Sequence, residues 1–142
     1  MGNYQSSIKK ISFEDIQFVL NQQEDSYLLI NTMNALEQEC LILNTLAHEK
    51  EEALINEYIK MGKKNKKIII YGKNTNDEKI VTKYYQLLNL GFYNVYIYSG
   101  GLFEWLLLQD IYGFQEFPTT KKEMDLLKFK PLKCLNIPLI EY

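Results

Sequence analysis

The part of the chain that could do chemistry is a polar loop after a short apolar run; it comprises Gly72, Lys73, Asn74, Thr75, Asn76 and Asp77. The apolar run, Ile68–Tyr71, is rich in β-branched residues and too short for a helix, which predicts a strand buried on both faces. An amphipathic run follows, so the order is strand, tight loop and helix start. Such a loop directs several backbone N–H groups at one point, which suits an anion or an anionic nucleophile. Residues 72–77 are therefore the candidate ligand-binding loop.

The same loop carries a competitor for any bound anion. Asp77 and Glu78 place negative charge at the helix start, and their carboxylates could accept hydrogen bonds from the loop, as N-cap residues do. Two alternatives follow. Either the loop is capped by its own side chains, or it binds a small anion or a peptide acid.

A second signal lies further along the chain. Gly91-Phe92-Tyr93-Asn94-Val95-Tyr96 leads into another apolar strand, and Gly100-Gly101 then precedes Trp105. In order and spacing, these elements resemble a rhodanese-homology domain over roughly Ile11 to Phe117. The resemblance implies an α/β fold of three layers, with a central, mostly parallel sheet of about five strands and helices on both faces, as the alternating strand and helix patterns also imply.

The resemblance also implies a chemistry that the chain does not match. In sulfurtransferases of this family the nucleophilic cysteine directly follows the strand, at the position of Gly72, and the loop usually ends in an arginine. This chain has glycine there and contains no arginine. The family's aspartate and arginine after the preceding strand correspond to Asn31-Thr32-Met33, so both charges are missing. Sulfur transfer needs a thiolate that becomes a persulfide. We therefore predict a pseudo-enzyme without catalytic residues.

A displaced cysteine is the alternative nucleophile, and the chain has two, Cys40 and Cys134. Glu37 and Glu39 flank Cys40 and would raise the pKa of its thiol, which favours a buried structural cysteine. Two functions stay open. The first is a non-catalytic binding, regulatory or structural module. The second is a sulfurtransferase that takes sulfur from thiosulfate or a persulfide through one of these cysteines.

Composition excludes several other classes. A chain of 142 residues fits one domain, and its net charge of −2 and pI near 5.5 argue against nucleic acid as a partner. The basic cluster Lys63-Lys64-Asn65-Lys66-Lys67 is typical of a solvated helix end, with a phosphate or RNA contact as the alternative. Two cysteines and the single His48 do not make a zinc site, so we expect neither metal nor cofactor.

The start of the sequence fits the N-myristoylation pattern, with Gly2 second and Ser6 sixth. The alternative is an unstructured polar terminus. A single myristoyl chain binds membranes only marginally, and Lys9-Lys10 would help weakly. No apolar run reaches the length of a membrane span. We expect a cytoplasmic protein, with membrane or virion association as alternatives.

The remaining patterns predict the elements that position the loop and divide the chain into three parts. These are a tail over 1–10, the rhodanese-like domain over 11–117, and a C-terminal strap over 118–142. The expected strands are Lys10-Ile11, Tyr27–Ile30, Cys40–Leu43 and Val95–Tyr98, besides Ile68–Tyr71. The expected helices start at Ser12 as N-cap with Asp15 as capping-box acid, cover His48–Met61 and Asp77–Leu90, and begin again near Phe103; the inward residues of the third are Ile80, Val81, Tyr84, Leu87 and Leu88.

The strap is too apolar for a free tail. Leu135, Ile137, Leu139 and Ile140 are expected to dock either on their own domain or on a partner chain. Phe117-Pro118-Thr119-Thr120 and the later Leu126–Pro131 resemble rhodanese-like proteins of large DNA viruses and unicellular eukaryotes. A protein partner, as yet unidentified, is the partner we expect.

Overall fold

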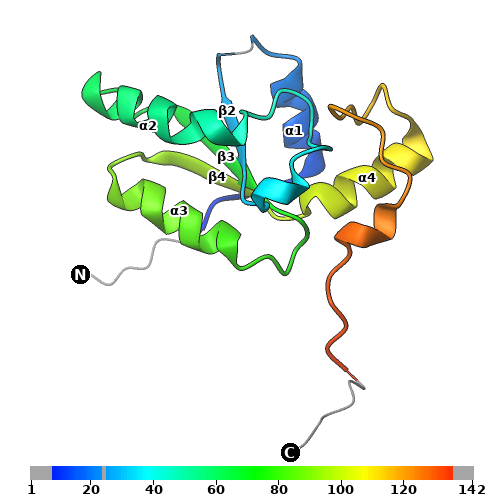
Figure 1. Cartoon of the computed structure of the whole chain (residues 1–142). Coiled ribbons are helices and arrows are strands. Elements are labelled where there is room, and N and C mark those ends of the chain that lie inside the picture. Colours follow the sequence, from blue (N-terminus) through cyan, green and yellow to red (C-terminus); the bar gives the residue numbers. More distant parts are fainter. Residues whose placement is uncertain (1–7, 24, 136–142) are drawn as a thin grey trace, which may run out of the picture.

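The computed structural model describes residues 8–23 and 25–135, which form an α/β domain around a parallel sheet (Figure 1). The sheet has four strands in these residues, in the order β1-β4-β3-β2, and every neighbouring pair is parallel. The strands are β1 (Lys10–Ile11), β2 (Leu28–Asn31), β3 (Lys67–Tyr71) and β4 (Asn94–Tyr98).

Helices cover both faces of this sheet. On one face lie α1 (Phe13–Leu20) and α4 (Gly101–Tyr112), and on the other α2 (Glu51–Lys60) and α3 (Lys79–Asn89). Short 3-10 turns occur at Ala35–Glu37, His48–Lys50 and Leu126–Phe129. The three-layer α/β fold expected from the sequence is thus confirmed.

The central strand β3 explains the two apolar layers. Because side chains alternate along a strand, Ile68 and Ile70 enter the core under α2 and α3, while Ile69 and Tyr71 enter the core under α1 and α4. All four are at most 1% exposed. A strand buried on both faces, as predicted, carries the loop of interest at its carboxyl end.

The start of α1 follows the predicted capping box. The Ser12 side chain accepts a hydrogen bond from the Glu14 N–H, and the Asp15 carboxylate accepts one from the Ser12 N–H at 2.9 Å. The two side chains satisfy N–H groups that the first helical turn leaves free.

The segment Cys40–Leu43 is not the strand that was predicted. Within the described residues it forms one isolated antiparallel bridge, between Ile42 and Thr119. Its backbone bonds to the chain that follows α4: Leu43 N–H donates to the Pro118 carbonyl and Thr120 N–H to the Leu41 carbonyl. This pairing replaces a place in the main sheet, whose four strands in the described residues agree roughly with the expected number of about five.

Two boundary details also differ from expectation. Helix α3 begins at Lys79 and not at Asp77, because the Asp77 side chain is engaged in the preceding loop. Val81, expected to face inward, is 42% exposed, whereas Ile80, Tyr84 and Leu87 are buried as predicted.

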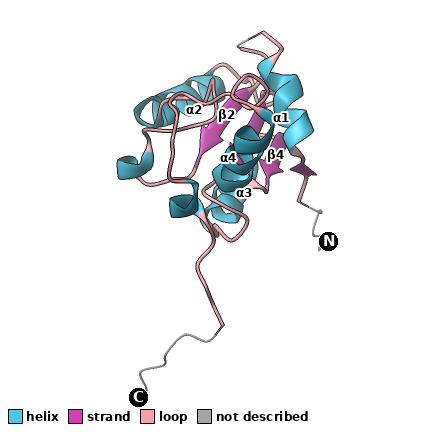
Figure 2. Ribbon diagram, turned by 90° about the vertical axis from the view of Figure 1, so that its right-hand side faces the viewer, coloured by secondary structure: helices cyan, strands magenta, loops and turns pink. Residues whose placement is uncertain are grey.

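The chain after α4 packs on the domain as far as Phe129 and leaves it from residue 130. Phe117, Thr119 and Phe129 are buried on the domain. Residues 130–135 then extend away from it, and Leu132 and Leu135 are 85% and 79% exposed (Figures 1 and 2). Gly2 and the apolar residues Ile137, Leu139 and Ile140 lie outside the described residues. Among the helices that are described, none has both the length and the apolar character needed to cross a membrane.

Candidate functional site

The loop between β3 and α3 closes on the carboxylate of Asp77. Asp77 Oδ2 accepts hydrogen bonds from the Lys73 N–H at 3.2 Å and from the Thr32 hydroxyl at 3.0 Å. Asp77 Oδ1 accepts from the Lys79 N–H at 3.0 Å. The loop therefore caps itself with an acidic side chain. Glu78, the other acid at this helix start, makes no side-chain cap bond.

Gly72 is buried directly beneath that carboxylate. A Cβ atom added at position 72 would lie 2.3 Å from Asp77 Oδ2 and 2.7 Å from the Thr32 hydroxyl oxygen. Both separations are far shorter than any non-bonded contact between such atoms. The space in which a side chain at position 72 would begin is thus already filled.

The start of α4 fixes the other side of the loop. Leu102 N–H donates to the Gly72 carbonyl and Phe103 N–H to the Lys73 carbonyl, both at 2.9 Å. This close approach needs Gly101, whose φ is +72° and whose added Cβ would lie 2.9 Å from Asn74 backbone atoms. The first free N–H groups of α4 are therefore used within the fold.

Asn74 ties the loop to the C-terminal part of the chain. Its buried side chain accepts a hydrogen bond from the Asn76 N–H at 2.8 Å and donates one to the Phe129 carbonyl at 2.9 Å. The sequence placed Asn74 in the loop but gave no signal for its contact with residue 129. Thr75 and Asn76 are exposed at the loop tip.

Asn31, at the end of β2, forms a neutral pair with Gln38. Asn31 Oδ1 accepts from Gln38 Nε2 at 2.8 Å and from the Met33 N–H at 2.9 Å, and Asn31 Nδ2 donates to Gln38 Oε1 at 3.1 Å. Asn31 therefore bonds both the backbone and a neighbouring side chain. Gln38 was missed, because nothing in its spacing marks it as a partner.

A pocket of about 660 Å³ opens beside the loop. It lies between the Ala35–Glu37 turn, the loop itself and the segment 127–132. Lys73 forms a 2.7 Å ion pair with Glu37 across it, and this hydrogen bond lowers the pKa of the Glu37 carboxyl. Lys79 donates to Asn34 Oδ1 at 2.9 Å.

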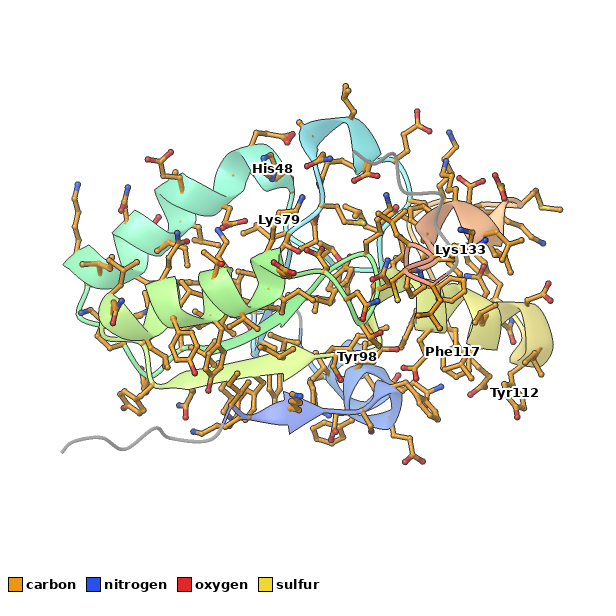
Figure 3. The ribbon with its side chains drawn as sticks, turned by 90° about the horizontal axis from the view of Figure 1, so that it is seen from below. His48, Lys79, Tyr98, Tyr112, Phe117 and Lys133 are labelled. Atoms are coloured by element: carbon orange, nitrogen blue, oxygen red, sulfur yellow. The ribbon has the colours of Figure 1, made fainter. Side chains whose placement is uncertain are left out.

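A second pocket, of about 420 Å³, adjoins the first. Met33 and Lys79 line both pockets. His48 and Lys79 come from the two helix starts that border the second pocket (Figure 3). Lys83 and Glu51 form an ion pair in its wall. Of the predicted loop residues, Lys73, Asn74, Asn76 and Asp77 line the first pocket, and Gly72 and Thr75 line neither.

The two cysteines differ in exposure. Cys40 is 4% exposed, its thiol donates to the Lys121 carbonyl at 3.2 Å, and burial raises its pKa. Cys134 is exposed. Residues 8–23 and 25–135 contain no group of three or more His, Cys, Asp or Glu that could hold a metal ion.

Comparisons with known proteins agree with this fold. The crystal structure of the Alr3790 protein from Anabaena sp. is 22% identical, covers 77% of this chain and 89% of that chain, and has a TM-score of 0.56. The solution NMR structure of the rhodanese-like domain of the same protein is 18% identical, covers 96% and 94%, and has a TM-score of 0.57. A full-length protein from Lactobacillus plantarum is 14% identical, covers 70% and 82%, and has a TM-score of 0.50.

These identities speak for the fold alone, and no functionally curated protein matches the chain in sequence. The family model described as a rhodanese-like domain matches residues 30–108, more than half of the chain. The match includes the end of β2, all of β3 and β4, the loop with Gly72 and most of α4. The chain therefore belongs to the rhodanese-like domain family.

Proposed function

We propose that this chain is a non-catalytic rhodanese-like domain that works by binding a protein partner. One observation carries the proposal: the Asp77 carboxylate fills the loop above Gly72, the position at which the family resemblance places the nucleophilic cysteine. A thiolate or persulfide would need that space and those N–H groups. Here a side chain of the chain itself uses them.

The charges around the loop support the same proposal. Lys73, which adjoins Gly72, is held by Glu37 at 2.7 Å, so its charge is already compensated. Asn31 and Gln38 form a neutral amide pair where the resemblance expects an aspartate and an arginine. An oxyanion or thiosulfate would meet few uncompensated cations beside Gly72.

Sulfur transfer through a displaced cysteine is less well supported. The Cys40 thiol is buried and donates a hydrogen bond to a carbonyl, and its raised pKa keeps it protonated near neutral pH. Cys134 lies on the exposed segment 130–135, away from the loop's hydrogen bonds. Free thiols of both kinds fit a reducing, cytoplasmic location.

The surface that suits a partner is the pocket of about 660 Å³ beside the loop. Leu127 and Leu132 line it and are 61% and 85% exposed. Lys79 and Lys130 also line it and take part in none of the salt bridges among the described residues. A peptide segment with acidic and apolar side chains is the partner chemistry that matches these walls.

The proposal also includes acylation of Gly2, which rests on the sequence pattern of residues 1–6. An acyl chain would bring the domain to a membrane reversibly, since one myristoyl group binds only marginally. Mass spectrometry of the N-terminus in the native host tests this part. Detection of a free amine on Gly2 would contradict the proposed acylation.

The central experiment is an assay of thiosulfate-to-cyanide sulfur transfer on four proteins. These are the unmodified chain, Asp77→Ala, Gly72→Cys and the double variant Gly72→Cys/Asp77→Ala. The first two are expected to be inactive. Gly72→Cys is expected to stay below the double variant, because Asp77 must leave before the new thiol has room.

Two outcomes would contradict the proposal. Activity in the unmodified chain would do so directly, and Cys40→Ser and Cys134→Ser would then identify the nucleophile. Equal activity of Gly72→Cys and the double variant would show that Asp77 does not block the loop. For the binding surface, a peptide that alternates Glu and Leu should shift the NMR amide signals of residues 73–79, and its Gln analogue should not.

A further inference from the structure

The amino ends of the strands bring together three stretches that are far apart in the sequence. The loop between α2 and β3 contacts the loop between α3 and β4: Lys64 Nζ donates to the Leu90 carbonyl at 2.7 Å, and Tyr93 N–H donates to the Lys64 carbonyl. The first described residues join them, since Lys9 Nζ donates to the Tyr93 carbonyl at 3.4 Å. Figure 1 shows the C-terminal ends of α2 and α3 on the side of the domain opposite α4.

This convergence makes a basic surface that we name the lysine face; its residues are Lys9, Lys63, Lys64, Lys66 and Lys67. None of the salt bridges among the described residues involves any of them. Where their side chains bond, they bond to neutral carbonyls, as Lys66 does to Asp25. Five positive charges therefore stay uncompensated by close carboxylates in the part of the chain that is described.

Two acids lie near this surface without cancelling it. Burial raises the pKa of the Tyr58 hydroxyl, and the nearby carboxylates of Glu57 and Asp25 add to the rise. Both carboxylates are exposed, and five lysines outnumber them. The lysine face is thus strongly positive on a chain whose net charge is −2.

Apolar side chains stand among these lysines. Met61, Leu90 and Tyr93 belong to the same two loops and are 52%, 44% and 59% exposed. Lysines interleaved with exposed apolar and aromatic residues are typical of surfaces that rest in the interface of an anionic bilayer. A purely electrostatic contact with nucleic acid phosphates would leave the three apolar side chains without a role.

We propose that the lysine face docks on an anionic lipid bilayer. Each lysine near an anionic leaflet strengthens binding by roughly fivefold, so several together give measurable affinity. Because the face lies at the amino ends of the strands, docking leaves the carboxyl ends, with the loop and its pocket, turned to the solution. A membrane-bound domain could then still receive its protein partner.

Gly2 stands seven residues before Lys9 in the sequence. An acyl chain there would add to membrane binding by the lysine face, to which Lys9 belongs. The two contributions are separable. The lysine face is expected to recognise anionic lipid in the chain without an acyl group, and the test uses that form.

The experiment is co-sedimentation of the unacylated full chain with vesicles at physiological salt. One set of vesicles contains phosphatidylcholine alone, and the other contains phosphatidylcholine and phosphatidylserine in equal parts. We expect binding to the second set only. The variant Lys9→Glu/Lys63→Glu, at two exposed lysines, should lower that binding by about tenfold or more. Its matched control, Lys122→Glu/Lys133→Glu, changes the net charge equally on other parts of the surface and should bind like the unmodified chain.

Other outcomes would overturn the proposal. Equal losses in the two charge variants would show that net charge, and not this face, attracts the lipid. Absence of binding to the anionic vesicles would show that the lysines are only solvated. Tighter binding to a single-stranded RNA oligonucleotide than to the vesicles would assign the face to nucleic acid. Circular dichroism of every variant checks that the fold is unchanged.

Discussion

The two ends of the sheet differ in whether their polar and charged groups are already bonded within the fold. At the carboxyl end, the side chains of Asp77 and Asn74 accept hydrogen bonds from loop N–H groups, and the start of α4 donates to two loop carbonyls. At the amino end, the side-chain charges of lysines such as Lys63 and Lys67 remain available to anions outside the fold. The end at which such folds commonly bind ligands is satisfied from within. The lysines at the other end can still attract an anionic partner.

Two glycines with the same backbone conformation give the largest test of this contrast. Gly101, at the closed end, and Gly62, at the open end, have φ values of +72° and +70°. A Cβ at Gly101 would meet backbone atoms at 2.9 Å, whereas none lies within 4 Å at Gly62. Gly62→Ala should cost about 1 kcal/mol and Gly101→Ala roughly 3 kcal/mol or more. Equilibrium urea unfolding measures both, and similar costs would remove the distinction between the ends.

A double-mutant cycle at Gly72 and Asp77 gives the next largest effect. Gly72→Ala should lower the free energy of unfolding by about 1–3 kcal/mol, because its Cβ collides with the Asp77 carboxylate. In an Asp77→Ala background the same change should cost clearly less. Additive costs in urea unfolding would mean that the carboxylate does not fill the loop.

Asn74 and Asn94 allow a comparison of side-chain hydrogen bonds at the carboxyl and amino ends of the sheet. Asn74 is buried and bonds the Phe129 carbonyl at 2.9 Å, while Asn94 bonds the Asn65 carbonyl at an exposed site. Asn74→Ala should cost about 1–2 kcal/mol and should speed amide hydrogen exchange over residues 126–130. Asn94→Ala is the control and should cost about 0.5 kcal/mol or less. Unchanged exchange in Asn74→Ala would contradict the anchoring role.

The smallest effect is a pH dependence at the closed end. The Lys73 ammonium lowers the pKa of Glu37 in the folded chain. The stabilisation by the Glu37–Lys73 pair is therefore fully present above the pKa of 4.5 that Glu37 has in the unfolded chain. It is lost as the pH falls through the lower pKa of Glu37 in the folded chain. Lys73→Met should remove about 0.2–1 kcal/mol near pH 7 and flatten this acid limb.

Lys63→Met, at the open end, is the matched control because Lys63 forms none of the salt bridges among the described residues. Thermal unfolding between pH 3 and pH 7, about the range in which a carboxylate titrates, compares the two. An identical acid limb in both variants would mean that the Glu37–Lys73 pair adds nothing to stability.

Short sequence patterns predicted the parts of the fold that depend on interactions between residues close together in the sequence. The run Ile68–Tyr71 predicts β3, since its residues can satisfy two apolar layers only as a central strand. Ser12 and Asp15 predict the start of α1, because a capping box is complete within one turn. The self-capped loop was one of two alternatives, and spacing alone could not choose between them because both use the same N–H groups.

Contacts between distant segments could not be predicted in this way. Ile42 bridges to Thr119 and Asn74 bonds to Phe129, and both pairs depend on where the chain after α4 returns to the domain. The apolar run Cys40–Leu43 therefore looked like a sheet strand although its backbone pairs elsewhere. The sequence showed the basic cluster at residues 63–67 and Lys9 separately, but not that they lie together, since more than fifty residues separate them.

The close approach of Gly72 to Asp77 also bears on how such a domain can change over generations. A mutation that places any larger residue at 72 meets the carboxylate at once, so it is disfavoured while Asp77 remains. A change at Asp77 alone removes three hydrogen bonds and provides nothing in return. Each single step is therefore expected to lower stability, and the Thr32 hydroxyl, 2.7 Å from the added Cβ, opposes a side chain at position 72 even without Asp77. Acquisition of a cysteine at position 72 is thus expected to require several coordinated substitutions.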